Sequence, residues 1–265
     1  MPRPDAPKTA LVTGADGGLG RAMCVGLAKA GYRVIAGVRT PVPGLKAEGV
    51  QSGELIYRVQ CDVSNPRICK SAVDAIILEF GSIDILINNA AIGMDAITPN
   101  IHDSSFKFYQ IDEDFWRKMM DVNVLGAFRL AKLVLPYQLE RGWGRIINIT
   151  TNLSTMVKAG FAPYGPSKAA IEAASVIWAK ELYGTGVTVN VLIPGGPADT
   201  RMIPVDDIAD RRSLIRPEAM VPPLLWLVSQ DANSISGRRY LARLWRCDLT
   251  FPEADEIAGA PGAWN

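Results

Sequence analysis

Short apolar runs rich in β-branched residues alternate with helical patterns from one end of this 265-residue chain to the other. Runs such as "IDILI" and "VTVNVLI" lack polar alternation, so strands formed by them would be apolar on both faces. Strands of this kind are typical of parallel sheets that helices cover on each side. Seven strands are predicted, within residues 9–13, 32–38, 54–63, 83–90, 144–150, 186–193 and 238–245. The chain is therefore expected to be an α/β protein with a seven-stranded, doubly wound parallel sheet.

The sequence contains no repeat, low-complexity tract or long linker. We therefore expect one domain over residues 1–265, with its core at about 9–245 and a tail at 247–265. Residues 93–111 and the tail lack the periodic spacing of apolar residues that is typical of helices and strands. We interpret the first as walls of a substrate site or subunit contacts, and the tail as an arm that wraps the surface.

Composition argues against several other classes of protein. The net charge is +1 and the basic residues are scattered, so no field is predicted that would attract nucleic acid or an anionic membrane. The four cysteines form neither a disulfide framework nor a zinc pattern, and the single histidine, His102, is assigned no role. We expect reduced thiols, no metal, no signal peptide, no membrane span and a cytoplasmic location.

The stretch "TALVTGADGGLG" places three glycines, Gly14, Gly18 and Gly20, at the first strand-to-helix turn. Glycines there let the backbone approach a pyrophosphate, whose charge faces the positive end of the following helix. The alternative is a glycine-rich turn without a ligand. Because the motif follows a strand and precedes a helix, it favours dinucleotide binding.

The end of the second predicted strand indicates which dinucleotide binds. An NAD site places an acidic side chain there, but this chain has Val38 followed by Arg39. A guanidinium suits the 2′-phosphate of NADP(H) through its forked donors, although Arg39 could equally be a solvated loop residue. NADP(H) is therefore preferred over NAD(H).

With "TGADGGLG", "CDV", "NNAA", "VNVLGAF", "NITT" and "YGPSK" in this order, the chain resembles the short-chain dehydrogenase/reductase family from about residue 9 to 240. The resemblance implies a Rossmann-like domain that binds NAD(P) and interconverts carbonyl and alcohol groups (EC 1.1.1.-). It also implies a homodimer or homotetramer that acts on a small molecule.

Cofactor contacts are predicted for residues of six segments, on the motifs above and on the resemblance. They are Gly14, Asp16, Gly18, Leu19, Gly20, Arg39, Asp62, Val63, Asn89, Ala90, Ala91, Tyr164, Lys168, Pro194, Gly195, Ala198 and Thr200. Two departures from the family stand out. Ala91 replaces a usual glycine, and Thr200 lies one residue late after the proline–glycine pair, so a one-residue bulge would be needed.

The predicted catalytic residues are Asn123, Thr151, Tyr164 and Lys168. Tyr164 and Lys168 are four apart at a helix start and so share one face, although a surface lysine beside a half-buried tyrosine would show the same spacing. Tyr164 is expected to be the general acid or base, with its pKa lowered by Lys168. Thr151 occupies the family's usual serine position, and Ser154 is the rival hydroxyl. The resemblance makes Asn123 the holder of a relay water.

The segment 199–216 lies where the family has its substrate-covering loop. It mixes Met202, Ile203 and Ile208 with Arg201, Arg211 and Arg212, which could close over an apolar carbonyl compound with an anionic group or form a solvated helix. We expect an apolar ketone, aldehyde or alcohol as substrate. A non-catalytic nucleotide-binding regulatory or scaffold protein, and a non-redox isomerase, dehydratase or dehalogenase, remain the alternatives.

Overall fold

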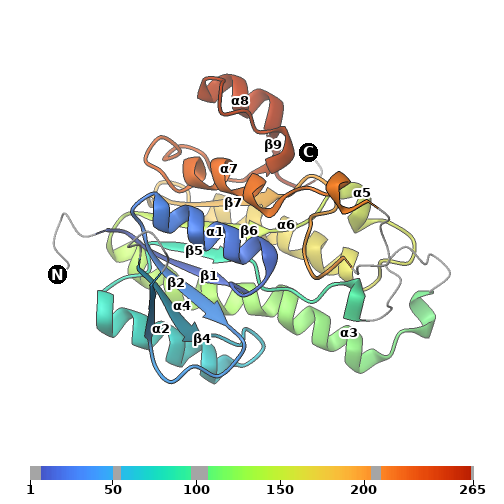
Figure 1. Cartoon of the computed structure of the whole chain (residues 1–265), viewed down its shortest axis with the longest axis horizontal. Coiled ribbons are helices and arrows are strands. Elements are labelled where there is room, and N and C mark those ends of the chain that lie inside the picture. The colour runs from blue at the N-terminus through green and yellow to red at the C-terminus, as the bar shows by residue number, and fades with distance from the viewer. Residues whose placement is uncertain (1–6, 50–54, 97–106, 204–209, 264–265) are drawn as a thin grey trace.

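The computed structural model describes residues 7–49, 55–96, 107–203 and 210–263, which form one twisted central sheet between layers of helices (Figure 1). Within these ranges the sheet has nine strands in the order β3-β4-β2-β1-β5-β6-β7-β8-β9. The strands are β1 (Thr9–Thr13), β2 (Arg33–Val38), β3 (Lys46–Gly49), β4 (Leu55–Gln60), β5 (Ile85–Asn88), β6 (Gly144–Ile149), β7 (Val187–Ile193), β8 (Arg238–Leu241) and β9 (Gly259–Pro261).

The α/β fold with a doubly wound sheet is confirmed, but the predicted count of seven strands is wrong. The seven strands from β4 to β8 in the spatial order pair in parallel, and each coincides with a predicted strand. The two additional strands, β3 and β9, pair antiparallel at the two edges. Their sequences, "KAEG" and "GAP", are short and carry no β-branched residue, so no apolar pattern could indicate them.

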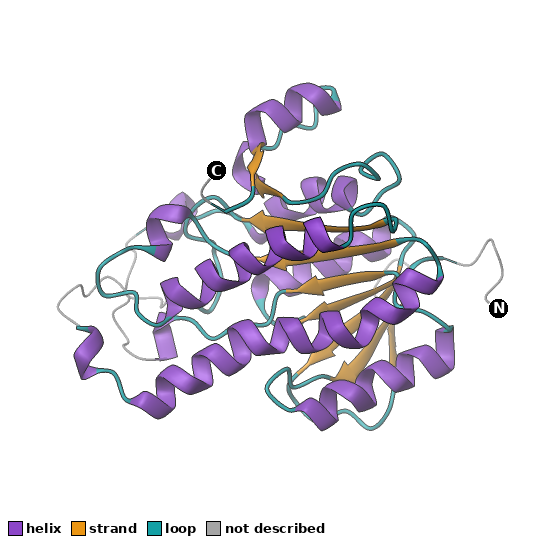
Figure 2. Cartoon of the chain, turned by 180° about the vertical axis from the view of Figure 1, so that it is seen from behind, coloured by secondary structure: helices purple, strands orange, loops and turns teal. Residues whose placement is uncertain are grey.

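Helices cover both faces of the sheet, as Figure 2 shows from behind. The helices are α1 (Gly18–Lys29), α2 (Pro66–Phe80), α3 (Glu113–Met120), α4 (Gly126–Glu140), α5 (Leu153–Met156), α6 (Tyr164–Glu181), α7 (Val221–Leu227) and α8 (Phe251–Ala258). Successive residues of β1 point to opposite faces, because Ala10 and Val12 pack with α1 and α7 whereas Leu11 packs with α2, α4 and α6. This double burial explains why the strands read as continuous apolar runs.

The topology creates a crevice at one edge of the sheet. β1 lies between β2 and β5, so the chain moves to one side after β1 and to the other side after β4. In such sheets, ligands bind outside the carboxyl ends of the strands at the point where the strand order reverses. The loops that follow β1, β2, β4, β5, β6 and β7 all begin at this edge, and they hold most of the predicted site residues.

The tail predicted to be a surface arm forms α8 and β9 at one end of the molecule (Figure 1). Phe251 at the start of α8 stacks on Trp226 of α7 with 3.8 Å between the ring centroids. Asp255 accepts hydrogen bonds from the Tyr240 hydroxyl (2.6 Å) and from Nη2 of Arg238 (2.9 Å). The tail is therefore packed and hydrogen-bonded against β8. Within the part of the chain that the structure describes, no helix is both long and apolar enough to cross a membrane.

We expect Asp255→Asn to lower the free energy of unfolding by about 1–2 kcal/mol, because its charge-assisted bonds to Arg238 and Tyr240 become weaker. Urea unfolding followed by circular dichroism measures this change. Glu256→Gln, at an exposed neighbour on the same helix, is the matched control and should change stability by less than about 0.5 kcal/mol. Equal effects of the two substitutions would contradict this role of Asp255.

Candidate active site

The glycine loop begins where the ends of β1 and β5 are joined by hydrogen bonds. Thr13 Oγ1 accepts from the backbone N–H groups of Asn89 (3.0 Å) and Ala90 (2.9 Å). In return, Asn89 Nδ2 donates to the carbonyl oxygens of Thr13 (2.9 Å) and Gly14 (3.1 Å). Gly14 has φ of +60°, which favours glycine. The predicted residues Gly14, Asn89 and Ala90 are therefore in contact. Thr13, which the sequence analysis missed, connects the two strand ends through its hydrogen bonds to Asn89 and Ala90.

The start of α1 fits a phosphate group. A Cβ atom at Gly20 would lie 2.3 Å from the Gly14 carbonyl oxygen, so the turn can close only with glycine there. The N-cap, Gly17, offers no side-chain hydrogen bond, and the first turn carries no acidic residue. The N–H groups of Gly18, Leu19 and Gly20 have no backbone acceptor among the described residues. Free N–H groups at a helix N-terminus bind anions, so this loop suits a pyrophosphate.

Arg39 stands at the same edge as the glycine loop. The Ala15 N–H donates to the Gly37 carbonyl oxygen (3.1 Å), which holds the loop beside the end of β2. Arg39 follows directly and is exposed, with no ion pair or hydrogen bond to another residue of the described ranges. Asp16 in the loop is also exposed, and its carboxylate would repel a phosphate placed near it. The arginine is thus available to a ligand, and its contact with a 2′-phosphate stays a prediction.

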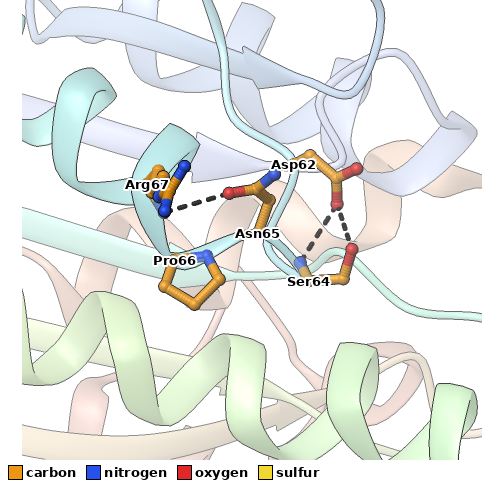
Figure 3. A pocket seen from close by; sticks show the side chains of 5 residues that line it. All are labelled: Asp62, Ser64, Asn65, Pro66 and Arg67. Carbon is orange, nitrogen blue, oxygen red and sulfur yellow. Dashed lines mark hydrogen bonds between the residues drawn. The ribbon is translucent and has the colours of Figure 1, made fainter.

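Asp62 and Val63 follow β4, and Figure 3 shows Asp62 together with Ser64, to which it is hydrogen-bonded. Asp62 Oδ1 accepts from the backbone N–H (3.0 Å) and the hydroxyl (2.7 Å) of Ser64, and Val63 is buried beside Gly126. Asp62 and Ser64 line a small open pocket together with Asn65, Pro66 and Arg67. That pocket contains none of the predicted catalytic residues, so it is separate from the centre of the predicted chemistry.

Thr151, Tyr164 and Lys168 come together where β6 ends and α6 begins. The Thr151 hydroxyl lies close enough to the Tyr164 phenol to affect its pKa. Lys168 Nζ donates to the carbonyl oxygen of Ile149 (2.9 Å) and lies 5.8 Å from the centre of the Tyr164 ring. Ser154, the rival hydroxyl, is exposed on α5. The geometry therefore favours Thr151 over Ser154.

The prediction that the pKa of Tyr164 is lowered is wrong for this structure. Burial raises the pKa of Tyr164 to about 12, and the hydrogen bond from Thr151 opposes this rise only in part. Asp95, which follows β5 and was missed by the sequence analysis, raises this pKa further. Burial also lowers the pKa of Lys168 to about 8. Desolvation disfavours the charged form of both groups, and it outweighs their attraction.

Asn123 lies in a π-helical turn, Asp121–Leu125, between α3 and α4. Its Oδ1 accepts from the Ile92 N–H (2.8 Å), and its Nδ2 donates to the Ile92 carbonyl oxygen (3.0 Å) and to Ser167 Oγ (2.9 Å). Both amide protons are therefore engaged, so a relay water would have to use another atom. Asn123 joins the loop after β5 to α6 through Ser167, a partner that the sequence analysis missed.

In the loop after β7, Ala198 forms an isolated parallel β-bridge with Ile215, and the bulge that the sequence analysis expects here stays a prediction. The Ile215 N–H donates to the Pro197 carbonyl oxygen, and the Asp199 N–H donates to the Ile215 carbonyl oxygen, both at 2.9 Å. The intervening Ala198 N–H has no backbone acceptor among described residues. Thr200 lies against the glycine loop, because its Cγ2 atom would be 2.8 Å from a Cβ at Gly18.

Two glycines of the site are covered by side chains from distant segments. Arg243, which the sequence analysis missed, crosses Gly195, whose φ is +93°. Met202 of the expected substrate-covering segment lies against Gly93, close to Ala91.

Two arginines of the segment that is expected to cover the substrate form ion pairs. Arg211 forms an ion pair with Asp199 (2.6 Å), and Arg212 pairs with Asp210 (3.0 Å). Ile208, His102 and residues 97–106 of the long connection lie outside the described residues. No group of three or more possible metal ligands occurs in the portion of the chain that was searched.

We expect the stability of the wild type relative to Lys168→Met to rise by about 2 kcal/mol between pH 8 and pH 10. Burial lowers the pKa of Lys168 from 10.5 to about 8, so unfolding takes up a proton in this window and becomes less favourable as pH rises. Urea unfolding of both variants across pH 7–10 measures the difference. Lys29→Met, at an exposed lysine, should show no such difference. Parallel pH profiles for wild type and Lys168→Met would contradict the assignment.

Comparison with known proteins agrees with this arrangement. Residues 8–207 match the family described as short chain dehydrogenase. Nodulation protein G of Azospirillum brasilense is 34% identical over 242 residues, which cover 87% of this chain and 94% of that protein. The 3-oxoacyl-(acyl-carrier-protein) reductase of Vibrio cholerae is 36% identical over 188 residues, covering 71% and 72%.

A third relative, acetoacetyl-CoA reductase of Rhizobium meliloti, is 30% identical over 239 residues, covering 87% of this chain and 94% of that protein. The family match spans the glycine loop and the segments that hold Thr151, Tyr164 and Lys168. The chain therefore belongs to the short-chain dehydrogenase/reductase family, with its Rossmann-type NAD(P)-binding fold, and is an oxidoreductase that acts on CH–OH and C=O groups.

Proposed function

We propose that this protein is an NADP(H)-dependent oxidoreductase that interconverts a ketone or aldehyde with the corresponding alcohol. The observation that carries the proposal is the cluster of Thr151, Tyr164 and Lys168, which adjoins an anion-binding glycine loop at the same edge of the sheet. The named activities of two relatives, reduction of 3-oxoacyl-(acyl-carrier-protein) and of acetoacetyl-CoA, make a 3-oxoacyl thioester the first substrate to test.

Reduction of a carbonyl group develops negative charge on its oxygen, so the site must supply a proton and hydrogen bonds to that atom. The nicotinamide supplies the hydride when it is bound. The raised pKa keeps Tyr164 protonated at neutral pH, so its phenol can donate the proton. The Thr151 hydroxyl donates a second hydrogen bond to the oxygen. Lys168 is mostly charged below pH 8, and its cation would stabilise the phenolate that remains and hold the ribose hydroxyls.

The preference for NADP(H) rests on Arg39. Its exposed guanidinium is free of intramolecular partners in the described ranges and follows β2, where the adenosine ribose of a bound dinucleotide would lie. The backbone N–H groups at the start of α1 would hold the pyrophosphate. Ala198 and Thr200 would contact the carboxamide, and Asp62 and Val63 the adenine.

We further propose a single-domain, cytoplasmic homo-oligomer with a small-molecule substrate. The described thiols are free, which suits a reducing compartment. Leu125 at the end of the π-helical turn, Phe128 on α4 and Ile177 on α6 are 47%, 45% and 55% exposed. Large apolar side chains exposed on adjacent helices favour contact with another subunit.

We expect the wild type to consume NADPH with acetoacetyl-CoA, and Tyr164→Phe to lower kcat by about 10²–10⁴-fold without weakening NADPH binding. The substitution removes the proton donor and leaves the ring. Steady-state absorbance of NADPH measures turnover. Tyr183→Phe, at a tyrosine that is 92% exposed, is the matched control and should leave kcat unchanged. NADPH binding without turnover of any ketone would favour the scaffold alternative.

We expect Arg39→Asp to weaken NADPH binding by at least about tenfold and to weaken NADH binding much less, because the acid repels the 2′-phosphate. Tryptophan-fluorescence titration with both nucleotides measures the two affinities. Lys29→Asp makes the same charge change at the opposite end of α1 and should leave both affinities within about twofold. An unchanged NADPH affinity in Arg39→Asp would refute this role of Arg39.

A further inference from the structure

A buried ion pair lies behind the predicted catalytic threonine. Arg239 Nε and Glu172 Oε1 are 2.8 Å apart, and Glu172 is 0% exposed. Glu172 belongs to α6 and Arg239 to β8, so the pair connects a helix with the sheet. Burying two charges is costly unless each finds further hydrogen bonds. The further partners of this pair therefore indicate what it holds in place.

Both charged groups bind the residues that follow β6. Glu172 Oε2 accepts a hydrogen bond from the Thr150 hydroxyl (2.8 Å). Arg239 Nη2 donates to the carbonyl oxygen of Thr151 (3.2 Å). The Thr151 side chain in turn lies beside the Tyr164 phenol. One ion pair thus holds the backbone of Thr150 and Thr151, and the hydroxyl of Thr151 is a predicted catalytic group.

Glu172 also lies on the same helix as the catalytic pair. Tyr164, Lys168 and Glu172 follow each other at intervals of four along α6, so they share one face. The far end of the described residues also lies near this carboxylate, because the Ala263 backbone opposes the rise in the pKa of Glu172 that burial causes. The Gly262 N–H donates to the Gly237 carbonyl oxygen (2.9 Å), which keeps this segment beside the start of β8.

We propose that Arg239 and Glu172 are positioning residues that hold the Thr151 hydroxyl within reach of Tyr164 and of the substrate oxygen. This inference rests on the proposed carbonyl–alcohol activity. Threonine has a branched side chain with restricted χ1, so the direction of its hydroxyl depends strongly on the position of its backbone. A misplacement of about 1 Å in a catalytic group can cost about 100-fold in rate. A rigid support for the Thr151 backbone therefore affects the reaction step more than substrate binding.

A double-mutant cycle tests whether Glu172 acts through the Thr151 hydroxyl. Wild type, Glu172→Gln, Thr151→Val and the double variant are compared for kcat and KM with NADPH and acetoacetyl-CoA. We expect Glu172→Gln to lower kcat about tenfold, with KM and the NADPH affinity within about twofold. Thr151→Val should lower kcat about 100-fold. The double variant should be no slower than Thr151→Val, because Glu172 has no hydroxyl left to position.

A stability-matched control and a second cycle complete the experiment. Asn233→Ala removes the side-chain acceptor of Arg145, a buried arginine at the start of β6, and should destabilise the fold without lowering kcat. Arg239→Lys preserves a cation for Glu172 but loses the donor to Thr151, and it gives a second cycle if Glu172→Gln does not fold.

The outcomes separate the two proposals. Turnover by the wild type with multiplicative losses in the double variant, or an unchanged kcat in both Glu172→Gln and Arg239→Lys, overturns the positioning role alone. If the wild type shows no turnover with any carbonyl substrate, the proposed function fails and this inference fails with it.

Discussion

Parallel pairing of seven strands is the constraint on which the rest of this structure depends. The carboxyl ends of parallel strands lie at a common edge of the sheet. Residues that are far apart in the sequence are therefore close together there. The joining of Thr13 to Asn89, and of β6 to α6 through Lys168 and Ile149, occurs at this edge. Because both faces of the sheet are covered by helices, each buried polar group at this edge needs a hydrogen-bond partner.

Burial has opposite consequences for the two titrating groups of the site. It raises the pKa of Tyr164 and lowers the pKa of Lys168, so both groups are driven towards their neutral forms. A neutral tyrosine is the form that donates a proton during reduction. Because the pKa of Lys168 is only about 8, a small change in the surroundings of its ammonium group is enough to change its charge.

Local patterns in the sequence predicted the parts of the structure that depend on local chemistry. The spacing of Tyr164 and Lys168 fixes a shared helix face, and the position of Gly14 and Gly20 at a strand–helix turn fixes the loop. The edge strands β3 and β9 could not be predicted, because short polar or glycine-containing strands owe their pairing to a neighbour. The support of Thr151 by Arg239 joins separate elements, and no local pattern reports such a contact. The direction of the pKa shift of Tyr164 could not be predicted from the sequence either, because it depends on how much of the phenol is desolvated.

The two antiparallel edge strands have a consequence for how copies of this protein can meet. β3 and β9 have only four and three residues, and β9 covers the outer side of β8. Short edge strands offer little unpaired backbone for another chain to extend the sheet. Any stable contact between copies must therefore be made chiefly through side chains on helices and loops. Such a surface can be altered by single substitutions without disturbing the hydrogen-bonded sheet that holds the active site.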